Sequence, residues 1–124
     1  MIYLDTHVVV WLYDGQVGKL SKAAAQKIQD EELLISPAVI LELQFLHEIQ
    51  RLRPTASHMV TTLAKEIALR VCDLPFIAVV ESASEQKWVR DPFDRLIVAH
   101  ANVNESPLVT KDERIRKYYR RAVW

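Results

Sequence analysis

Residues 90–101 read RDPFDRLIVAHA, and this stretch predicts the start of a buried helix with two carboxylates in its first turn. Asp91 is a favourable N-cap, and Pro92 suits the first helical position because its missing N–H would have no partner there. The residues from Leu96 to Ala99 are apolar all round the helix, which indicates burial. Asp91 and Asp94 therefore have two interpretations. They cap the helix and complement its dipole, or they help to bind a metal ion.

The length and composition indicate a single globular domain over residues 1–124. Half of the residues are hydrophobic and only two are glycine, as in proteins with short loops and a well-formed core. The 16 acidic and 16 basic residues balance, so the net charge indicates no partner. No apolar stretch approaches the length of a membrane span. The one cysteine, Cys72, excludes an internal disulfide and suits the reducing cytoplasm, where we expect the protein to reside.

Short apolar stretches alternate with helical patterns, which favours an α/β fold with a parallel sheet. The predicted strands are residues 1–4, 33–36, 71–73, 106–110 and 122–124. The predicted helical segments are residues 8–12, 23–29, 37–46, 56–69, 75–84, 91–104 and a basic turn at 117–120.

Four acidic residues are predicted to meet at one edge of this sheet. Asp5 and Asp112 each follow a short apolar strand, at the end where open α/β sheets bind their ligands. Asp94 begins a helix, and Glu42 lies within a strongly apolar one, where an unpaired buried carboxylate costs several kcal/mol. Two like charges about 4 Å apart repel by roughly 4 kcal/mol at an effective dielectric constant near 20. Such a cluster therefore predicts a cation among the carboxylates.

The available ligands indicate which cation this is. The acids offer only oxygen atoms, and none of the four histidines has the spacing of a zinc site, so the pattern favours Mg²⁺ or Mn²⁺. Each acid also has a structural interpretation. Asp5 can cap the following helix, and Glu42 can lie at the edge of an apolar stripe with its carboxylate in water.

Taken together, these motifs resemble those of PIN domains, and within them the VapC-type toxins of bacterial and archaeal toxin–antitoxin pairs. The resemblance runs from Ile2 to Trp124. No single motif is specific to PIN domains, but the four motifs in this order are. They are Leu4-Asp5-Thr6, Glu42 in its apolar helix, Asp91-Pro92-Phe93-Asp94-Arg95-Leu96-Ile97 and Leu108-Val109-Thr110-Lys111-Asp112.

The resemblance implies a three-layer α/β/α sandwich around a mostly parallel sheet. It also implies an endoribonuclease that depends on Mg²⁺ or Mn²⁺, forms a homodimer and is held inactive by a VapB-like antitoxin. The metal-binding catalytic acids implied by the family motifs are Asp5, Glu42, Asp94 and Asp112. Asp91 matches a pattern found in only part of the family, so its place among the ligands stays open. Thr6 and Thr110 match polar positions that orient the acids.

Basic residues are predicted to contact the RNA. Six lie between positions 111 and 121, and among them Arg116 and Lys117 are predicted to bind the RNA backbone, although a solvated helix face would have the same pattern. Arg95, beside the predicted metal site, either contacts a phosphate or pairs with one of the carboxylates.

Two other functions stay open at this point. One is a catalytically silent PIN-like module that binds RNA or a protein, against which the presence of all four acids argues. The other is a metal-dependent nuclease or phosphatase that acts on DNA or small phosphates, and no sequence feature excludes it. A receiver domain fits less well, since its middle strand should end in a phosphorylatable aspartate, whereas the strand at 33–36 is followed by Pro37.

Overall fold

The short apolar stretches form one five-stranded sheet in which all neighbouring strands are parallel. This computed structural model describes residues 1–124, and its strand order is β3-β2-β1-β4-β5. The strands are β1 (Ile2–Leu4), β2 (Leu33–Ile35), β3 (Arg70–Val71), β4 (Leu108–Val109) and β5 (Ala122–Val123). The α/β prediction is confirmed, and the sheet is wholly rather than mostly parallel. The predicted third strand is displaced, since β3 ends before Cys72.

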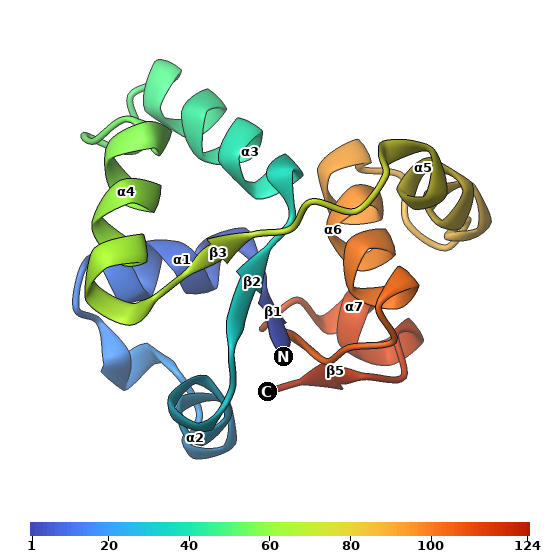
Figure 1. Ribbon diagram of the computed structural model, residues 1–124, viewed down its shortest axis with the longest axis horizontal. Helices are drawn as coiled ribbons and strands as arrows, with labels where there is room; N and C mark the ends of the chain where they lie inside the picture. Colours follow the sequence, from blue (N-terminus) through green and yellow to red (C-terminus); the bar gives the residue numbers. More distant parts are fainter.

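Helices cover the two faces of the sheet and complete the three-layer α/β/α sandwich. They are α1 (Thr6–Tyr13), η1 (Val17–Lys19), α2 (Lys22–Asp30), α3 (Pro37–Glu48), α4 (Ala56–Ile67), α5 (Phe76–Glu85), α6 (Pro92–Val103) and α7 (Glu113–Tyr118). In Figure 1, α1 and α4 lie on one side of β1 and β2, and α5 and α6 lie on the other. No helix combines the length and the hydrophobicity that a membrane span requires.

Two helix boundaries predicted from the sequence are wrong. The predicted helix at 56–69 ends instead at Ile67, because Ala68 adopts the left-handed conformation with φ 56°. Of the basic turn expected at 117–120, only Lys117 and Tyr118 are helical, and they close α7, which begins at Glu113 and ends at Tyr118. Asp112 caps this helix, since its Oδ1 accepts a hydrogen bond from the N–H of Ile115 at 2.9 Å.

Burial explains why the central strand is apolar throughout. Ile2, Tyr3 and Leu4 are all 0% exposed, as expected for a strand with neighbours on both sides and helices on both faces. Ser36 and His100 form a buried polar pair beneath the sheet edge, with Oγ and Nδ1 2.8 Å apart. Nδ1 of His100 also lies 3.1 Å from the carbonyl oxygen of Leu96, so the buried imidazole has polar partners.

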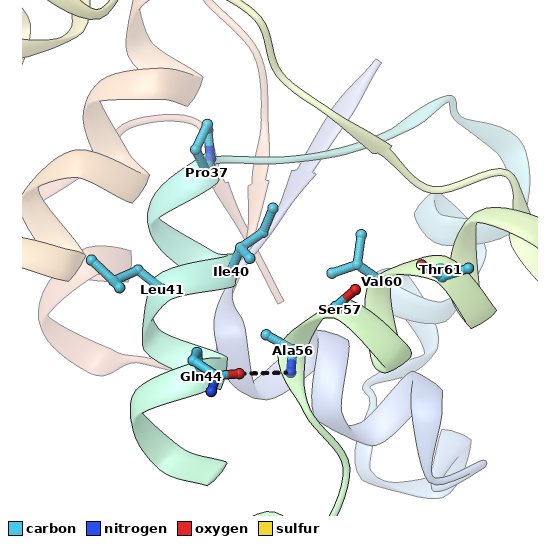
Figure 2. Close-up of a pocket in the computed structure, with 8 residues that line it drawn as sticks. All are labelled: Pro37, Ile40, Leu41, Gln44, Ala56, Ser57, Val60 and Thr61. Carbon is cyan, nitrogen blue, oxygen red and sulfur yellow. Dashed lines mark hydrogen bonds between the residues drawn. The ribbon is translucent and has the colours of Figure 1, made fainter. Parts of the chain in front are cut away.

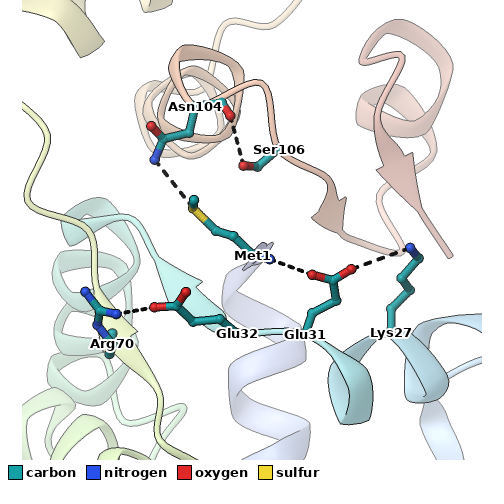
Figure 3. Close-up of polar contacts among 7 residues, drawn as sticks. All are labelled: Met1, Lys27, Glu31, Glu32, Arg70, Asn104 and Ser106. Atoms are coloured by element: carbon teal, nitrogen blue, oxygen red, sulfur yellow. Dashed lines mark hydrogen bonds and ion pairs between the residues drawn. The ribbon is translucent and has the colours of Figure 1, made fainter.

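The ion pairs of the protein gather where β1 begins, at the amino edge of the sheet. Figure 3 shows the amino group of Met1 on Glu31, 2.5 Å from Oε2, and Arg70 paired with Glu32. The other two pairs are Lys27 with Glu31 and Arg121 with Glu105. Such partly exposed pairs contribute little to stability individually. Their location matters more, because the acids that follow β1 and β4 at the opposite edge have no ion-pair partner.

Candidate active site

A cavity of about 380 Å³ opens at the carboxyl edge of β1 and β4. It contains all four acids that were predicted from the sequence to bind metal. The lining residues are Asp5, His7, Trp11, Glu42, Asp94, Lys111 and Asp112. Asp5 and Asp112 come from the ends of strands, and Glu42 and Asp94 from α3 and α6. The parallel topology brings these distant stretches of the chain to one place.

Asp5 is held at both of its carboxylate oxygens. The residue is only 7% exposed. Oδ1 accepts a hydrogen bond from the N–H of Thr6 at 2.7 Å, and Oδ2 accepts one from the hydroxyl of Thr110 at 2.5 Å. Asp5 therefore caps α1 and at the same time links the end of β1 to the end of β4. The capping interpretation and the site interpretation are both compatible with this geometry.

Glu42 points into the cavity from α3 rather than out into water. Its carboxylate accepts a hydrogen bond from the hydroxyl of Thr6, whose backbone N–H donates to Asp5. Thr6 thus holds two acids together, and Thr110 holds Asp5 and also accepts the N–H of Asp112 at 3.0 Å. Both threonines have the positions in which they would orient the acids.

Burial and mutual repulsion disfavour the ionised forms of these acids. Burial raises the pKa of Asp5 and of Glu42 above the ordinary values. For Asp94 burial is again the main cause, and the negative charges of Asp5, Asp91, Glu42 and Asp112 add to it, so that its pKa rises to about 7. Near neutral pH, Asp94 is therefore partly protonated as long as no cation is bound among these acids.

Asp91 and Asp112 both cap helices, but only Asp112 lines the cavity. Asp91 Oδ1 accepts the N–H of Asp94 at 3.0 Å, and its exposed side chain lies outside the cavity wall. Asp91 influences the site through its charge, which contributes to the raised pKa values of Glu42 and Asp94.

The chemistry of the cavity suits a hard divalent cation. Its acids offer only oxygen ligands, and none of the four ion pairs in the molecule involves one of them. In the present arrangement, no group of three or more His, Cys, Asp or Glu side chains is positioned to hold a metal ion. Asp5 and Glu42 are instead hydrogen-bonded to threonine hydroxyls. The donor set fits Mg²⁺ or Mn²⁺, and binding would require these carboxylates to turn toward the ion.

Three lining residues were not predicted from the sequence. His7, which was considered only as a histidine without zinc-site spacing, follows Asp5-Thr6 directly, and its exposed side chain lines the cavity. Trp11 lies four residues further along α1, on the same face as His7. Lys111 lies between Thr110 and Asp112. Adjacency to the acidic motifs was the signal that could have identified His7 and Lys111.

The predicted basic residues lie outside the acidic cavity. Arg95 lines a separate hollow beside α5 and α6, where its Nε is buried without a hydrogen-bond partner. It forms no ion pair, so the pairing with a carboxylate considered for it is absent. Arg116 and Lys117 are exposed on α7 and line an open hollow of about 450 Å³ beside β5.

A larger hollow of about 570 Å³ lies between α3 and α4 (Figure 2), but it has a different character. It is lined by residues such as Ile40 and Val60 and contains no acid. The amide of Gln44 closes one end by accepting the N–H of Ala56 at 3.3 Å. Without ionisable groups it offers no hydrolytic chemistry, so the acidic cavity is the candidate active site.

Comparisons with known proteins agree on the family. The family model of the PIN domain matches residues 2–121. Ribonuclease VapC22 from Mycobacterium tuberculosis is 34% identical over 121 residues, covering 94% of this chain and 91% of that protein. The fold matches VapBC2 from Rickettsia felis, solved bound to a DNA fragment of its promoter (TM-score 0.66, 18% identity, 96% of this chain and 94% of that one). It also matches a toxin–antitoxin complex from Klebsiella pneumoniae (TM-score 0.66, 13% identity, 100% and 97%).

Replacing Asp94 by Asn is expected to flatten the pH dependence of stability in the metal-free protein. The pKa of Asp94 is 3.8 in a model peptide and about 7 in the folded protein. Between these values the folded state binds more protons than the unfolded state, so the free energy of unfolding falls as pH rises through this window. At about pH 8 we expect Asp94→Asn to be more stable than the parent by about 1–2 kcal/mol, after allowance for solvent screening.

Urea unfolding in EDTA at about pH 4 and pH 8 measures this effect. Asp91→Asn is the matched control, because Asn caps a helix as well as Asp does and the side chain lies outside the cavity. It should largely keep the pH profile of the parent. An Asp94→Asn variant whose stability falls with pH as steeply as that of the parent would refute the assigned repulsion.

Proposed function

This chain belongs to the PIN-domain family, and we propose that it is a Mg²⁺- or Mn²⁺-dependent endoribonuclease, the toxin of a toxin–antitoxin pair. One observation carries the proposal: four carboxylates without ion-pair partners line a single cavity at the carboxyl edge of the sheet. Ribonuclease VapC22 supports the reaction class, and the VapBC complexes support the pairing with an antitoxin. We expect the pair to act in the cytoplasm.

In this mechanism the acids would hold the metal and the threonines would hold the acids. The ligands would be Asp5, Glu42, Asp94 and Asp112. Asp91 would cap α6 without being one of these four ligands. A bound ion supplies charge that offsets the phosphate and lowers the pKa of an attacking water. Thr110 keeps Asp5 oriented from β4, and Thr6 keeps Glu42 oriented from α1. Lys111 brings a positive charge to the cavity wall, where it can bind a phosphate oxygen.

RNA binding would continue from the cavity onto α7. Arg116 and Lys117 are exposed, and the hollow that they line is suited to the phosphate backbone. Arg95 stays a predicted phosphate contact with less support, because it lines a hollow away from the acids.

The partner that inhibits the enzyme is proposed to be a VapB-like antitoxin. Such a partner can place an Arg or Lys side chain among the acids, where its charge would take the place of the metal. We also expect the protein to be a homodimer, as the family resemblance implies. The silent-module and DNA or small-phosphate alternatives are tested by the assays below.

We expect the purified protein to cleave single-stranded RNA with Mg²⁺ or Mn²⁺ and to lose this activity in EDTA. Asp94→Asn should lower the rate by about 100-fold or more, because it removes both a ligand and the charge that holds the ion. Asp91→Asn should keep most of the activity, while Asp91→Ala should cost about 1 kcal/mol of stability through loss of the cap.

The assay compares RNA, single-stranded DNA and a nucleoside monophosphate at equal concentrations. Preferential cleavage of DNA or of the monophosphate would contradict the RNA assignment. Full activity in EDTA would contradict the metal mechanism, and an Asp91→Asn variant as inactive as Asp94→Asn would place Asp91 among the ligands.

Expression of the protein without its antitoxin should arrest the growth of a bacterial host. Asp5→Asn should relieve the arrest, because it replaces a proposed metal-binding carboxylate by a neutral amide. Co-expression of the cognate antitoxin should relieve the arrest as well. Immunoblotting must show equal protein levels, and Asp73→Asn, an exposed acid far from the cavity in sequence, is the control that should remain toxic. Equal toxicity of Asp5→Asn and the parent would be the opposing result.

A further inference from the structure

Two neighbouring tryptophan rings belong to two different cavities. Trp11 lines the acidic cavity, and Trp124 lines the hollow beside β5 together with Arg116, Lys117 and one acid, Glu113. The centroids of the two rings are 5.9 Å apart, with an angle of 57° between their planes. The two rings are therefore neighbours, and together they are here called the tryptophan platform, because one lines the acidic cavity and the other lines the hollow with the cations of α7.

Packing against the core accounts for only part of this arrangement. Both rings contact the hydrophobic core, yet both stay partly exposed. Cations also lie close to them: Lys19 Nζ is 5.8 Å from the ring centroid of Trp11, and Lys111 Nζ is 6.0 Å from that of Trp124. The ring of His7 is also close to Trp11, with their centroids 6.3 Å apart. A surface that needed only to cover the core would not require aromatic rings framed by positive charge.

Aromatic rings beside cations are the combination that binds single-stranded nucleic acid. Bases stack on the rings while the cations bind the phosphates, and each stacked base contributes about 1–3 kcal/mol with little dependence on sequence. In a duplex the bases are stacked on one another, so their faces cannot reach a protein ring. A platform next to the acids thus selects unpaired nucleotides.

We propose that Trp11 and Trp124 form a stacking site for a nucleobase of single-stranded RNA next to the cleaved phosphate. The inference depends on the proposed ribonuclease function and names two residues that would bind a base of its substrate. With the scissile phosphate at the acids, the adjoining base lies on the tryptophan platform, and the following backbone reaches Arg116 and Lys117. The third tryptophan, Trp88, lines neither of these two cavities, and its ring is stacked on Tyr118 at 5.4 Å and 23°.

The test measures binding of a fluorescein-labelled, mixed-sequence single-stranded RNA of about ten nucleotides, a length within known site sizes. The protein carries Asp94→Asn so that the RNA stays intact. Adding Trp11→Leu should weaken binding about tenfold, whereas Trp11→Phe should keep most of the affinity, since only Leu lacks a π-face. Trp88→Leu is the matched control and should bind as the parent does. Melting temperatures identify any variant that fails to fold.

Two further arms separate stacking from charge. Against an abasic ribose-phosphate chain of the same length, Trp11→Leu should have no effect. Arg116→Ala with Lys117→Ala should reduce the dependence of affinity on salt, whereas Trp11→Leu should leave that slope unchanged. In a protein with Trp88→Phe and Trp124→Phe, RNA should quench the fluorescence of Trp11. In one with Trp11→Phe and Trp124→Phe, the emission of Trp88 should not change.

The inference is overturned if the Trp11→Leu variant binds RNA as tightly as the protein that retains Trp11. It is equally overturned if the substitution weakens binding of the abasic chain as much as binding of RNA. It is also overturned if Trp11→Leu impairs only inhibition by the antitoxin, because the platform would then be a protein-binding surface. These outcomes leave the ribonuclease function intact, since cleavage of RNA by the parent is measured separately. Absence of both RNA cleavage by the parent and RNA binding by the Asp94→Asn protein would instead refute the function itself.

Discussion

The repulsion among carboxylates at one edge of a parallel sheet is the constraint on which this structure depends. Parallel strands end at the same edge, so residues after β1 and β4 must meet there, and Glu42 of α3 and Asp94 of α6 join them. Asp5, Glu42, Asp94 and Asp112 are the residues that the chain places at this edge. The ion pairs of the molecule lie elsewhere, and Lys111 is the one lysine or arginine that lines the cavity with these four acids. An external cation is the physical complement of the cavity.

The same side chains that crowd the site also build the fold around it. Asp5 and Asp112 cap the helices that follow β1 and β4, and Thr6 and Thr110 donate hydrogen bonds to the acids. Caps and hydrogen bonds offset part of the cost of burying charge. They also hold Asp5 and Glu42 at the wall of the empty cavity, from which both carboxylates would have to turn to bind an ion. Stability and function are therefore coupled at these residues, so substitutions there will change both.

Local patterns predicted the fold and the acidic cluster because both depend on short-range rules. The buried strand β1 shows an uninterrupted apolar stretch, and the Asp91-Pro92 pair shows a helix start. Contacts between residues that are far apart in the sequence could not be predicted from such local patterns. The roles of Trp11 and Lys111 in the cavity wall depend on tertiary packing, and so does the burial of Arg95 Nε away from the acids. The early start of α7 was missed because Asp112 was considered only as a ligand and not also as a cap.

Calorimetric titration of Mn²⁺ into the metal-free protein at about pH 7 tests the central claim most directly. Because the pKa of Asp94 is about 7 without metal, ion binding should displace a proton. The heat of binding should therefore differ between two buffers of unlike ionisation enthalpy, and the difference should be largely lost in Asp94→Asn. Equal heats in both buffers, or no binding at all, would contradict the view that carboxylate repulsion at this edge is relieved by a divalent cation.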